Sequence, residues 1–336
     1  MYNKRFINID DTFLIREGME HEVLNQCLSF VINQRGAKRD FLEKAYKNNI
    51  SENIELSQNI YDEGVDIIVK RKINKDYKFL NLNKSLIFYK YKERKGLNLD
   101  KIDKFQLSKI KFFPQTYLSG DFIFQQLAKG VYYRPNKLSD FNSPLLTNIA
   151  QVISVLSSLK NDEVKISSYL AQFEFPNKED SLNSKIINNF ILLLKKYQNE
   201  NIRTTLTHGD FKFEHFFTLN NQLEYVVDWE NVDLRSIFFD LLNFFVPWFV
   251  NRSYNYSQIK NYILKFIQDF LPHLHEYILD KYDLYFSVYA LERYARLSSA
   301  RSFGFDLDAA YKRYNLLLKN LSEEIFSKNL DISVAK

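Results

Sequence analysis

The sequence contains few of the residues that mark disulfide-rich, collagen-like or low-complexity proteins. Among its 336 residues there is one cysteine, Cys27, so no disulfide can form within the chain. A single thiol agrees with a reducing compartment, and we expect a cytoplasmic location. Glycine and proline are also scarce, with 8 and 6 residues. This composition excludes collagen-like and Pro/Gly-rich disordered chains.

A long uninterrupted apolar run is missing as well. The longest apolar stretch runs from Ile237 to Val250, and it is interrupted by Asp240, Asn243 and Pro247. It is too short and too polar to span a bilayer, so we expect a buried helix and no transmembrane segment. Peripheral contact with a membrane stays open. The N-terminal residues MYNKRFINIDD lack the apolar core of a signal peptide.

The residues that are abundant indicate a large folded core. Hydrophobic residues make up 46% of the chain and aromatic residues 16%, which excludes a disordered protein. The net charge of +5 comes from 46 basic and 41 acidic residues. This mild excess suits anionic ligands such as nucleotides or acidic glycans, and without an arginine-rich tract we expect no nucleic-acid partner.

The sequence of the first part of the chain predicts helix followed by strands. Residues 19–60 look helical and charged. The runs VDIIVKRKI, YKFLNLN and SLIFYKY then predict three antiparallel strands in a meander. A short helix is expected over 99–111, and TYLSGDFIFQQL predicts two strands around the turn at 119–121. These elements form a small α+β lobe.

From Pro144 onward the pattern is mainly helical. Apolar residues recur at steps of three and four over 146–159, and helices are also expected in SKIINNFILLLKKY, QIKNYILKFIQDFL and YFSVYALERYARLSSA. Strands return in RTTLT, HFFTLN and QLEYVVDWE, the last two joined by an Asn-Asn turn at 220–221. With a boundary near Gly130, the sequence predicts an N-terminal helical extension (1–60), a β-rich lobe (61–130) and a helical lobe with a hairpin (131–336).

The most informative segment is THGDFKFEHFFTLNNQLEYVVDWE. Asp210 precedes the first strand of its hairpin and Asp228 follows the second, so both carboxylates should emerge at the same end of the ribbon. Such a pair suits phosphoryl transfer, which needs positioning and charge neutralisation. One carboxylate would orient an attacking hydroxyl and take its proton, and the other would hold Mg²⁺, which prefers oxygen ligands.

This segment resembles the catalytic core of the aminoglycoside phosphotransferase, choline kinase and bacterial sugar-kinase superfamily, a branch of the protein-kinase-like fold. The matching features are His-Gly-Asp ending at Asp210, the apolar strand that ends in Asp-Trp-Glu from Asp228, and Asp240 at the start of an apolar helix. The resemblance is close over residues 203–245, moderate over about 84–200, and absent over 1–60.

The resemblance implies a bilobal α+β protein-kinase-like fold and an ATP-dependent phosphotransferase with an alcohol group as acceptor. Asp210 would be the base or orienting residue, Lys212 would contact the γ-phosphate, and Asp228 would hold the metal. The nucleotide would sit between the lobes, with its adenine near Gln125, Gln126 and Leu127. Lys90 is the expected nucleotide-binding lysine because it lies on the third strand. Lys92 shares its strand face and is the alternative.

Three departures from the family pattern bear on this interpretation. His215 stands where the family has an asparagine that contacts a second metal, and imidazole favours softer metals such as Mn²⁺ over Mg²⁺. The alternatives are that only one metal is held, or that Glu214 or a water takes the place of this ligand. In the phosphate-covering loop, Asn-Lys-Asp at 74–76 replaces glycines, with Lys75 compensating by charge. The acidic helix partner of the lysine is not obvious, with Asp103 nearest to its place and Gln106 as a neutral option.

The charge of the chain indicates the class of acceptor. The C-terminal half carries several arginines and is not strongly acidic, which favours a neutral or anionic sugar, such as a surface-glycan component, over a cationic antibiotic. These arginines are Arg252, Arg293, Arg296, Arg301 and Arg313. Two alternatives stay open. One is a pseudokinase binding module, and the other is a kinase-fold enzyme with nucleotidyl-transfer chemistry.

Overall fold

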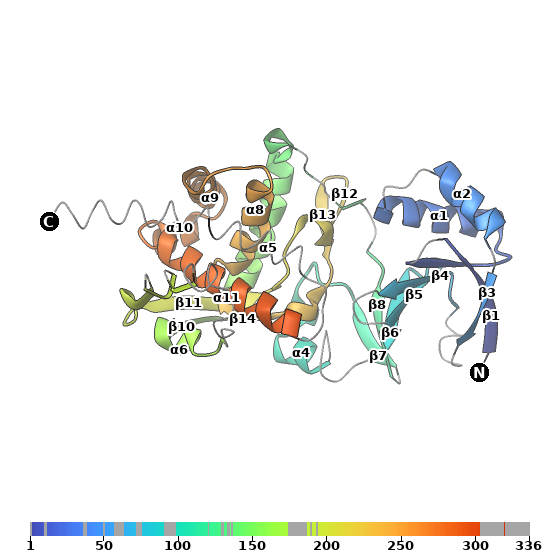
Figure 1. Ribbon diagram of the computed structural model, residues 1–336, viewed down its shortest axis with the longest axis horizontal. Helices are drawn as coiled ribbons and strands as arrows, with labels where there is room; N and C mark the ends of the chain where they lie inside the picture. Colours follow the sequence, from blue (N-terminus) through green and yellow to red (C-terminus); the bar gives the residue numbers. More distant parts are fainter. Residues whose placement is uncertain are drawn as a thin grey trace. The chain divides into compact units, whose positions relative to one another are not determined.

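The computed structural model divides the chain into two compact units. One consists of Met1–Tyr133 with Phe216–Glu230, and the other of Arg134–His215 with Asn231–Lys336. The structure describes residues 2–9, 12–35, 39–49, 51–56, 64–71, 76–90, 99–119, 121–128, 131–132, 135, 137–173, 187–188, 190–192, 194–302 and 319. A β-rich first part and a largely helical second part confirm the predicted α+β class (Figure 1).

The first unit is built on an eight-stranded antiparallel sheet of order β3-β1-β2-β4-β5-β6-β8-β7. Its strands are β1 (Tyr2–Asn8), β2 (Phe13–Arg16), β3 (Ser51–Leu56), β4 (Ile67–Arg71), β5 (Asp76–Asn81), β6 (Leu86–Lys90), β7 (Thr116–Ser119) and β8 (Phe122–Gln126). The meander β4-β5-β6 and the pairing of β7 with β8 confirm the five strands predicted from the sequence.

The N-terminal segment contains the two expected helices and, in addition, three strands. Helices α1 (His21–Arg35) and α2 (Arg39–Asn48) confirm the helical pattern. Strands β1, β2 and β3 were not predicted, and the expectation of helix over 51–56 is wrong. In β3 the apolar residues Ile54 and Leu56 alternate with polar ones and pack on one face of the sheet. This period-two signal is only six residues long and follows strongly charged helices.

Each face of the sheet has its own apolar cluster. One face packs Phe6, Phe79, Phe88 and Phe124, and the ring of Phe88 stacks on those of Phe79 and Phe124 at centroid distances of 5.5 and 5.1 Å. On the opposite face, strand residues pack against α1 and α2, and this second cluster includes Cys27 of α1, which is fully buried. Burial raises the pKa of the Cys27 thiol to about 12, so this cysteine is a core residue as expected and not a nucleophile.

A short hairpin carries the segment singled out in the sequence. Strands β12 (Phe216–Leu219) and β13 (Gln222–Val226) pair antiparallel, and β9 (Val131–Tyr132) joins β12. Asn220 and Asn221 connect the strands with φ of 51° and 62°, the left-handed conformation that asparagine tolerates in tight hairpin turns. In the same unit, the helix expected over 99–111 ends early, as α4 (Leu99–Lys104) followed by the 3₁₀ turn η1 (Leu107–Lys109).

The second unit packs helices against a three-stranded sheet of order β10-β11-β14. Its strands are β10 (Asn161–Lys165), β11 (Asn201–Thr207) and β14 (Asp233–Ser236). Its helices are α5 (Ser143–Leu159), α6 (Ile166–Leu170), α8 (Phe239–Val250), α9 (Tyr256–Phe270), α10 (Pro272–Ile278) and α11 (Tyr282–Ser302). The helix expected in SKIINNFILLLKKY lies partly outside the described residues.

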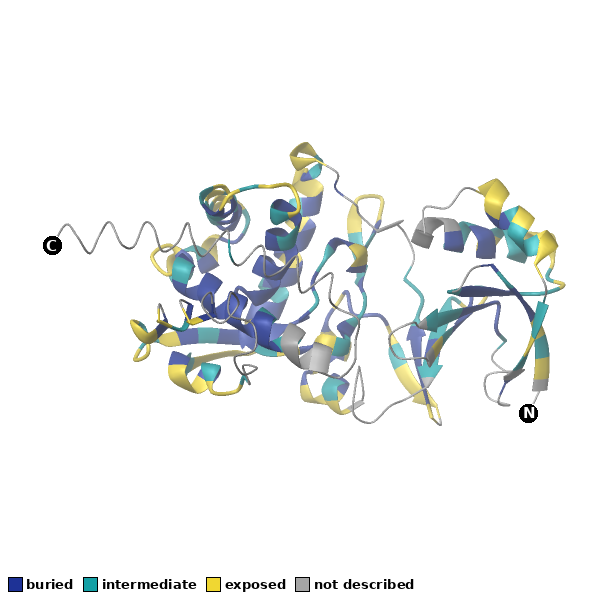
Figure 2. Ribbon diagram, viewed as in Figure 1, coloured by how far each residue is buried: buried dark blue, intermediate teal, exposed yellow. Residues whose placement is uncertain are grey.

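Helix α8 is the centre of this unit. It is buried on nearly every side, as Figure 2 shows, which confirms the buried helix expected over this apolar stretch. Among the described residues, no helix is long and apolar enough to cross a membrane. The first turn of α8 places the carboxylate of Asp240 inside the core, next to the end of β11.

Candidate active site

A tight turn follows β11 and presents Asp210. Gly209 has φ of 81°, a conformation that L-residues with a side chain rarely adopt. A Cβ at this position would lie 2.2 Å from the carbonyl oxygen of Asn231 and 2.5 Å from Nη1 of Arg235. The glycine is therefore required twice, by the backbone conformation and by the close approach of these two groups.

The carboxylate of Asp240 holds this turn through hydrogen bonds to its backbone. Its two oxygens accept hydrogen bonds from the backbone N–H groups of His208 (2.6 Å) and Gly209 (2.9 Å). Burial raises the pKa of Asp240, and the two N–H donors act in the opposite direction by stabilising its ionised form. One helical turn further along α8, Asn243 donates to the carbonyl of Phe211 (3.1 Å). Helix α8 therefore fixes the backbone on both sides of Asp210.

Asp210 and Lys212 form an ion pair at the surface of the turn. The Nζ of Lys212 lies 2.8 Å from Oδ2 of Asp210, and the two side chains are 44% and 22% exposed. The backbone N–H of Asp210 donates to Nδ1 of His208 at 3.3 Å. Both side chains expected to do chemistry are thus close together and accessible to a ligand.

His215 is buried at the end of the 3₁₀ turn η3 (Phe213–His215). Its Nδ1 lies 2.9 Å from the backbone carbonyl oxygen of Asp210 and donates its hydrogen to it. In the neutral ring the lone pair is then on Nε2. This arrangement is the usual one for metal-binding histidines, where a backbone carbonyl sets the tautomer and the orientation of the ring.

Asp228 occupies a constrained turn after β13. Its φ is 68°, an uncommon value that aspartate tolerates better than most residues. The next residue, Trp229, is buried, donates from Nε1 to the carbonyl of Val226 (2.6 Å) and meets the ring of Phe113 edge to face. Lys101 of α4 donates to the carbonyl of Glu230 at 2.9 Å. The turn is therefore anchored on both sides of Asp228.

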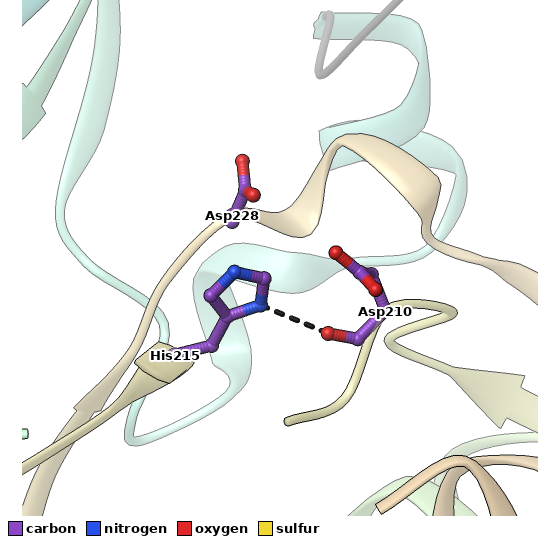
Figure 3. Close-up of side chains that lie close together, drawn as sticks. All are labelled: Asp210, His215 and Asp228. Carbon is purple, nitrogen blue, oxygen red and sulfur yellow. Dashed lines mark hydrogen bonds between the residues drawn. The ribbon is translucent and has the colours of Figure 1, made fainter. Parts of the chain in front are cut away.

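Together, Asp210, His215 and Asp228 make a candidate metal site. Each offers one ligand atom, and these atoms lie within 4.8 Å of one another (Figure 3). Within the described part of the chain this is the one such group of histidine, cysteine and carboxylate ligands. Two carboxylates and an oriented imidazole fit a divalent cation. The structure thus brings together the two metal ligands and the base named from the sequence.

The expected nucleotide-binding residues are only partly described. Lys90 ends β6 opposite Phe122, its side chain is outside the described residues, and so are Lys75 and Lys92. Asp103 and Gln106 are exposed, and the Gln106 side chain accepts from Lys109. The adenine contacts expected near 125–127 stay a prediction. In that segment Gln125 donates to Thr116, and the N–H groups of Gln126 and Leu127 bond to the carbonyls of Gln115 and Ser85.

Sequence reasoning missed two residues that hold the site. Asn243 anchors the chain after Asp210, and the buried Arg235 lies against Gly209. The only signal for Arg235 was its place between the apolar residues Leu234 and Ile237, where an arginine that becomes buried needs acidic and carbonyl partners. Asn243 had a weaker one, an amide within the same apolar run as Asp240.

Comparison with known proteins identifies the fold. No family model matches the sequence, and no curated protein matches it significantly. The chain is similar in structure to a thermostable mutant of aminoglycoside phosphotransferase APH(4)-Ia in its apo form, with a TM-score of 0.54 and 12% identity over 78% of this chain and 98% of that one. It is also similar to choline kinase LicA from Streptococcus pneumoniae, with a TM-score of 0.52 and 15% identity over 79% and 97%. The predicted protein-kinase-like fold is confirmed.

The geometry of the turn predicts an unusually costly Gly209→Ala substitution. We expect a loss of roughly 3 kcal/mol or more in the free energy of unfolding, measured by urea denaturation, because backbone strain and a steric clash add. Gly18→Ala is the matched control, since Gly18 has φ of 69° and nothing within 4 Å of an added Cβ. It should cost only about 1–2 kcal/mol. Equal losses in the two variants would contradict the clash at Gly209.

Proposed function

We propose that the protein transfers the γ-phosphate of a nucleoside triphosphate, ATP by preference, to a hydroxyl group of a small molecule. The observation that carries the proposal is the approach of Asp210, His215 and Asp228 to within 4.8 Å, with Lys212 in contact with Asp210. Phosphoryl transfer requires this combination of a base for the acceptor hydroxyl, a cation site and a positive side chain. The fold similarity to small-molecule kinases supports the same reaction.

In this mechanism Asp210 orients the acceptor hydroxyl and takes its proton as the oxygen attacks phosphorus. Lys212, held against Asp210 in the structure, turns to the γ-phosphate when the nucleotide enters. Asp228 and His215, beside Asp210, would hold a divalent metal, which would supply positive charge to offset that of the nucleotide phosphates. Asp240 takes no part in the chemistry and keeps Asp210 in place through the N–H groups of the turn.

The nucleotide base and the acceptor are proposed from the sequence. Gln125, Gln126 and Leu127 remain the proposed adenine contacts, and Lys90 the proposed phosphate contact. For the acceptor we propose a neutral or anionic sugar, because the chain carries a net charge of +5 and arginines in its helical half. The names of the two similar structures refer to an aminoglycoside and to choline, so the fold itself does not select an acceptor.

Removal of Asp228 should abolish metal-dependent nucleotide binding. With ATP and a divalent cation at about 100 times the dissociation constant, the native protein should gain about 2.7 kcal/mol of stability, seen as a higher melting temperature. Asp228→Ala should lose this gain, while Asp121→Ala, which removes an exposed aspartate outside the site, should keep it. Unchanged stabilisation in Asp228→Ala would contradict the assignment.

The imidazole of His215 should shift metal preference from Mg²⁺ toward Mn²⁺. Nitrogen ligands favour transition metals over Mg²⁺, so calorimetric titration should give at least about tenfold tighter binding of Mn²⁺ than of Mg²⁺. His215→Asn, which offers an amide oxygen, should reduce this ratio, and His273→Asn at an exposed position should not. A ratio that is the same in all three proteins would exclude His215 as a ligand.

Turnover on sugars separates the proposed enzyme from its alternatives. A screen of neutral, acidic and amino sugars with ATP should find phosphorylated product, and Asp210→Asn should lower the rate about 100- to 10,000-fold with little change in nucleotide affinity. Nucleotide binding without product on any acceptor would favour a pseudokinase. A nucleotide adduct in the intact mass would favour nucleotidyl transfer.

A further inference from the structure

A buried ion pair lies behind the turn that carries Asp210. Arg235 of β14 and Glu292 of α11 are 1% and 0% exposed, and Nε of the arginine is 2.9 Å from Oε1 of the glutamate. Such a pair adds little net stability, because removing two charges from water costs about as much as their attraction returns. Its position, not its strength, indicates what it does.

The guanidinium group of Arg235 bridges the two ends of the segment that contains the site. Its Nη1 donates to Oγ1 of Thr207 (2.6 Å), and its Nη2 donates to the carbonyl of Asn231 (2.7 Å). Thr207 is three residues before Asp210, and Asn231 is three residues after Asp228. The same group fills the space next to Gly209 where a Cβ would otherwise fit.

Glu292 holds the guanidinium from the opposite side. Its Oε2 accepts from the hydroxyl of Tyr169 on α6 (2.6 Å), and its Oε1 also accepts from Nε of Arg296 (2.8 Å). The hydroxyl of Tyr169 in turn accepts from the backbone N–H of Ser236, the residue after Arg235. Glu292 on α11, itself held by Tyr169 on α6, thereby fixes the position of the arginine.

We propose that Arg235, clamped by Glu292, is a positioning residue that sets the conformation of the His208–Asp210 turn. The turn lies between two buried charged groups, with Asp240 bonded to its N–H groups and Arg235 packed against Gly209. The kinetic part of this proposal rests on the proposed phosphotransfer, whereas the structural part does not.

Arg235→Lys tests the bridge, because lysine keeps a charge for Glu292 but lacks the planar fork that reaches two acceptors at once. We expect the N–H groups of His208 and Gly209 to exchange with deuterium at least tenfold faster, measured by mass spectrometry on the peptide that contains them. In phosphotransfer, kcat should fall at least tenfold while KM for the nucleotide changes less than threefold.

Two further variants separate positioning from general stability. Arg235→Met with Glu292→Leu removes both charges, so the melting temperature should stay near that of the native protein, yet the turn should exchange as fast as in Arg235→Lys. Arg296→Met is the matched control, since it removes the other guanidinium bound to Glu292 and should leave exchange and kcat unchanged.

Native exchange of the turn in both Arg235→Lys and the double variant would overturn the proposal. So would exchange that rises equally throughout the second unit, because that result describes a structural role only. If the native protein shows no phosphotransfer at all, the proposed function fails, but the exchange measurement still decides whether Arg235 sets the turn.

Discussion

The arrangement of the candidate site depends on the contact between one buried carboxylate and two backbone N–H groups. The carboxylate of Asp240 is buried, and it is stabilised there by hydrogen bonds from the backbone N–H groups of His208 and Gly209. Burying an ionised group without such partners would cost several kcal/mol. The first turn of α8 is consequently fixed against the end of β11, and this contact determines the position of Asp210.

Two residues in left-handed backbone conformations then orient the candidate site residues Asp210 and Asp228. Gly209 turns the chain before Asp210, and Asp228 is itself held at φ of 68°. Glycine adopts this conformation freely, whereas a residue with a side chain, such as Asp228, keeps it only where the surroundings enforce it. The surroundings are visible here: Arg235 and Asn231 crowd Gly209, and Trp229 fixes the turn at Asp228 through its bond to Val226.

The sequence predicted the fold class and the three strands of the meander, because alternating apolar residues and turn residues are local signals. It also predicted that Asp210 and Asp228 would emerge together, since a hairpin of known length brings its two ends to one side. Strands β1, β2 and β3 were not predicted because β3 pairs with β1, and β2 with β4, across helices α1 and α2, whose helical pattern dominates this segment of the sequence.

The residues that support the site were harder to predict than those that form it. Arg235 acquires its role only when β14 pairs with β11 and α11 brings Glu292 within 2.9 Å. Nothing in the sequence near Arg235 names a partner 57 positions away. The hydrogen bond from His215 to the carbonyl of Asp210 was equally hidden, since it depends on the 3₁₀ turn between them.

The burial of Cys27 has a practical consequence. The chain has one sulfhydryl group, and it is sealed between α1 and the sheet beside Met19. A thiol reagent can reach it only when that helix separates from the sheet or the whole chain unfolds, so under native conditions the labelling rate measures openings of the N-terminal segment. The protein thus carries an intrinsic single-site probe of local unfolding, and no engineered cysteine is needed to follow that motion.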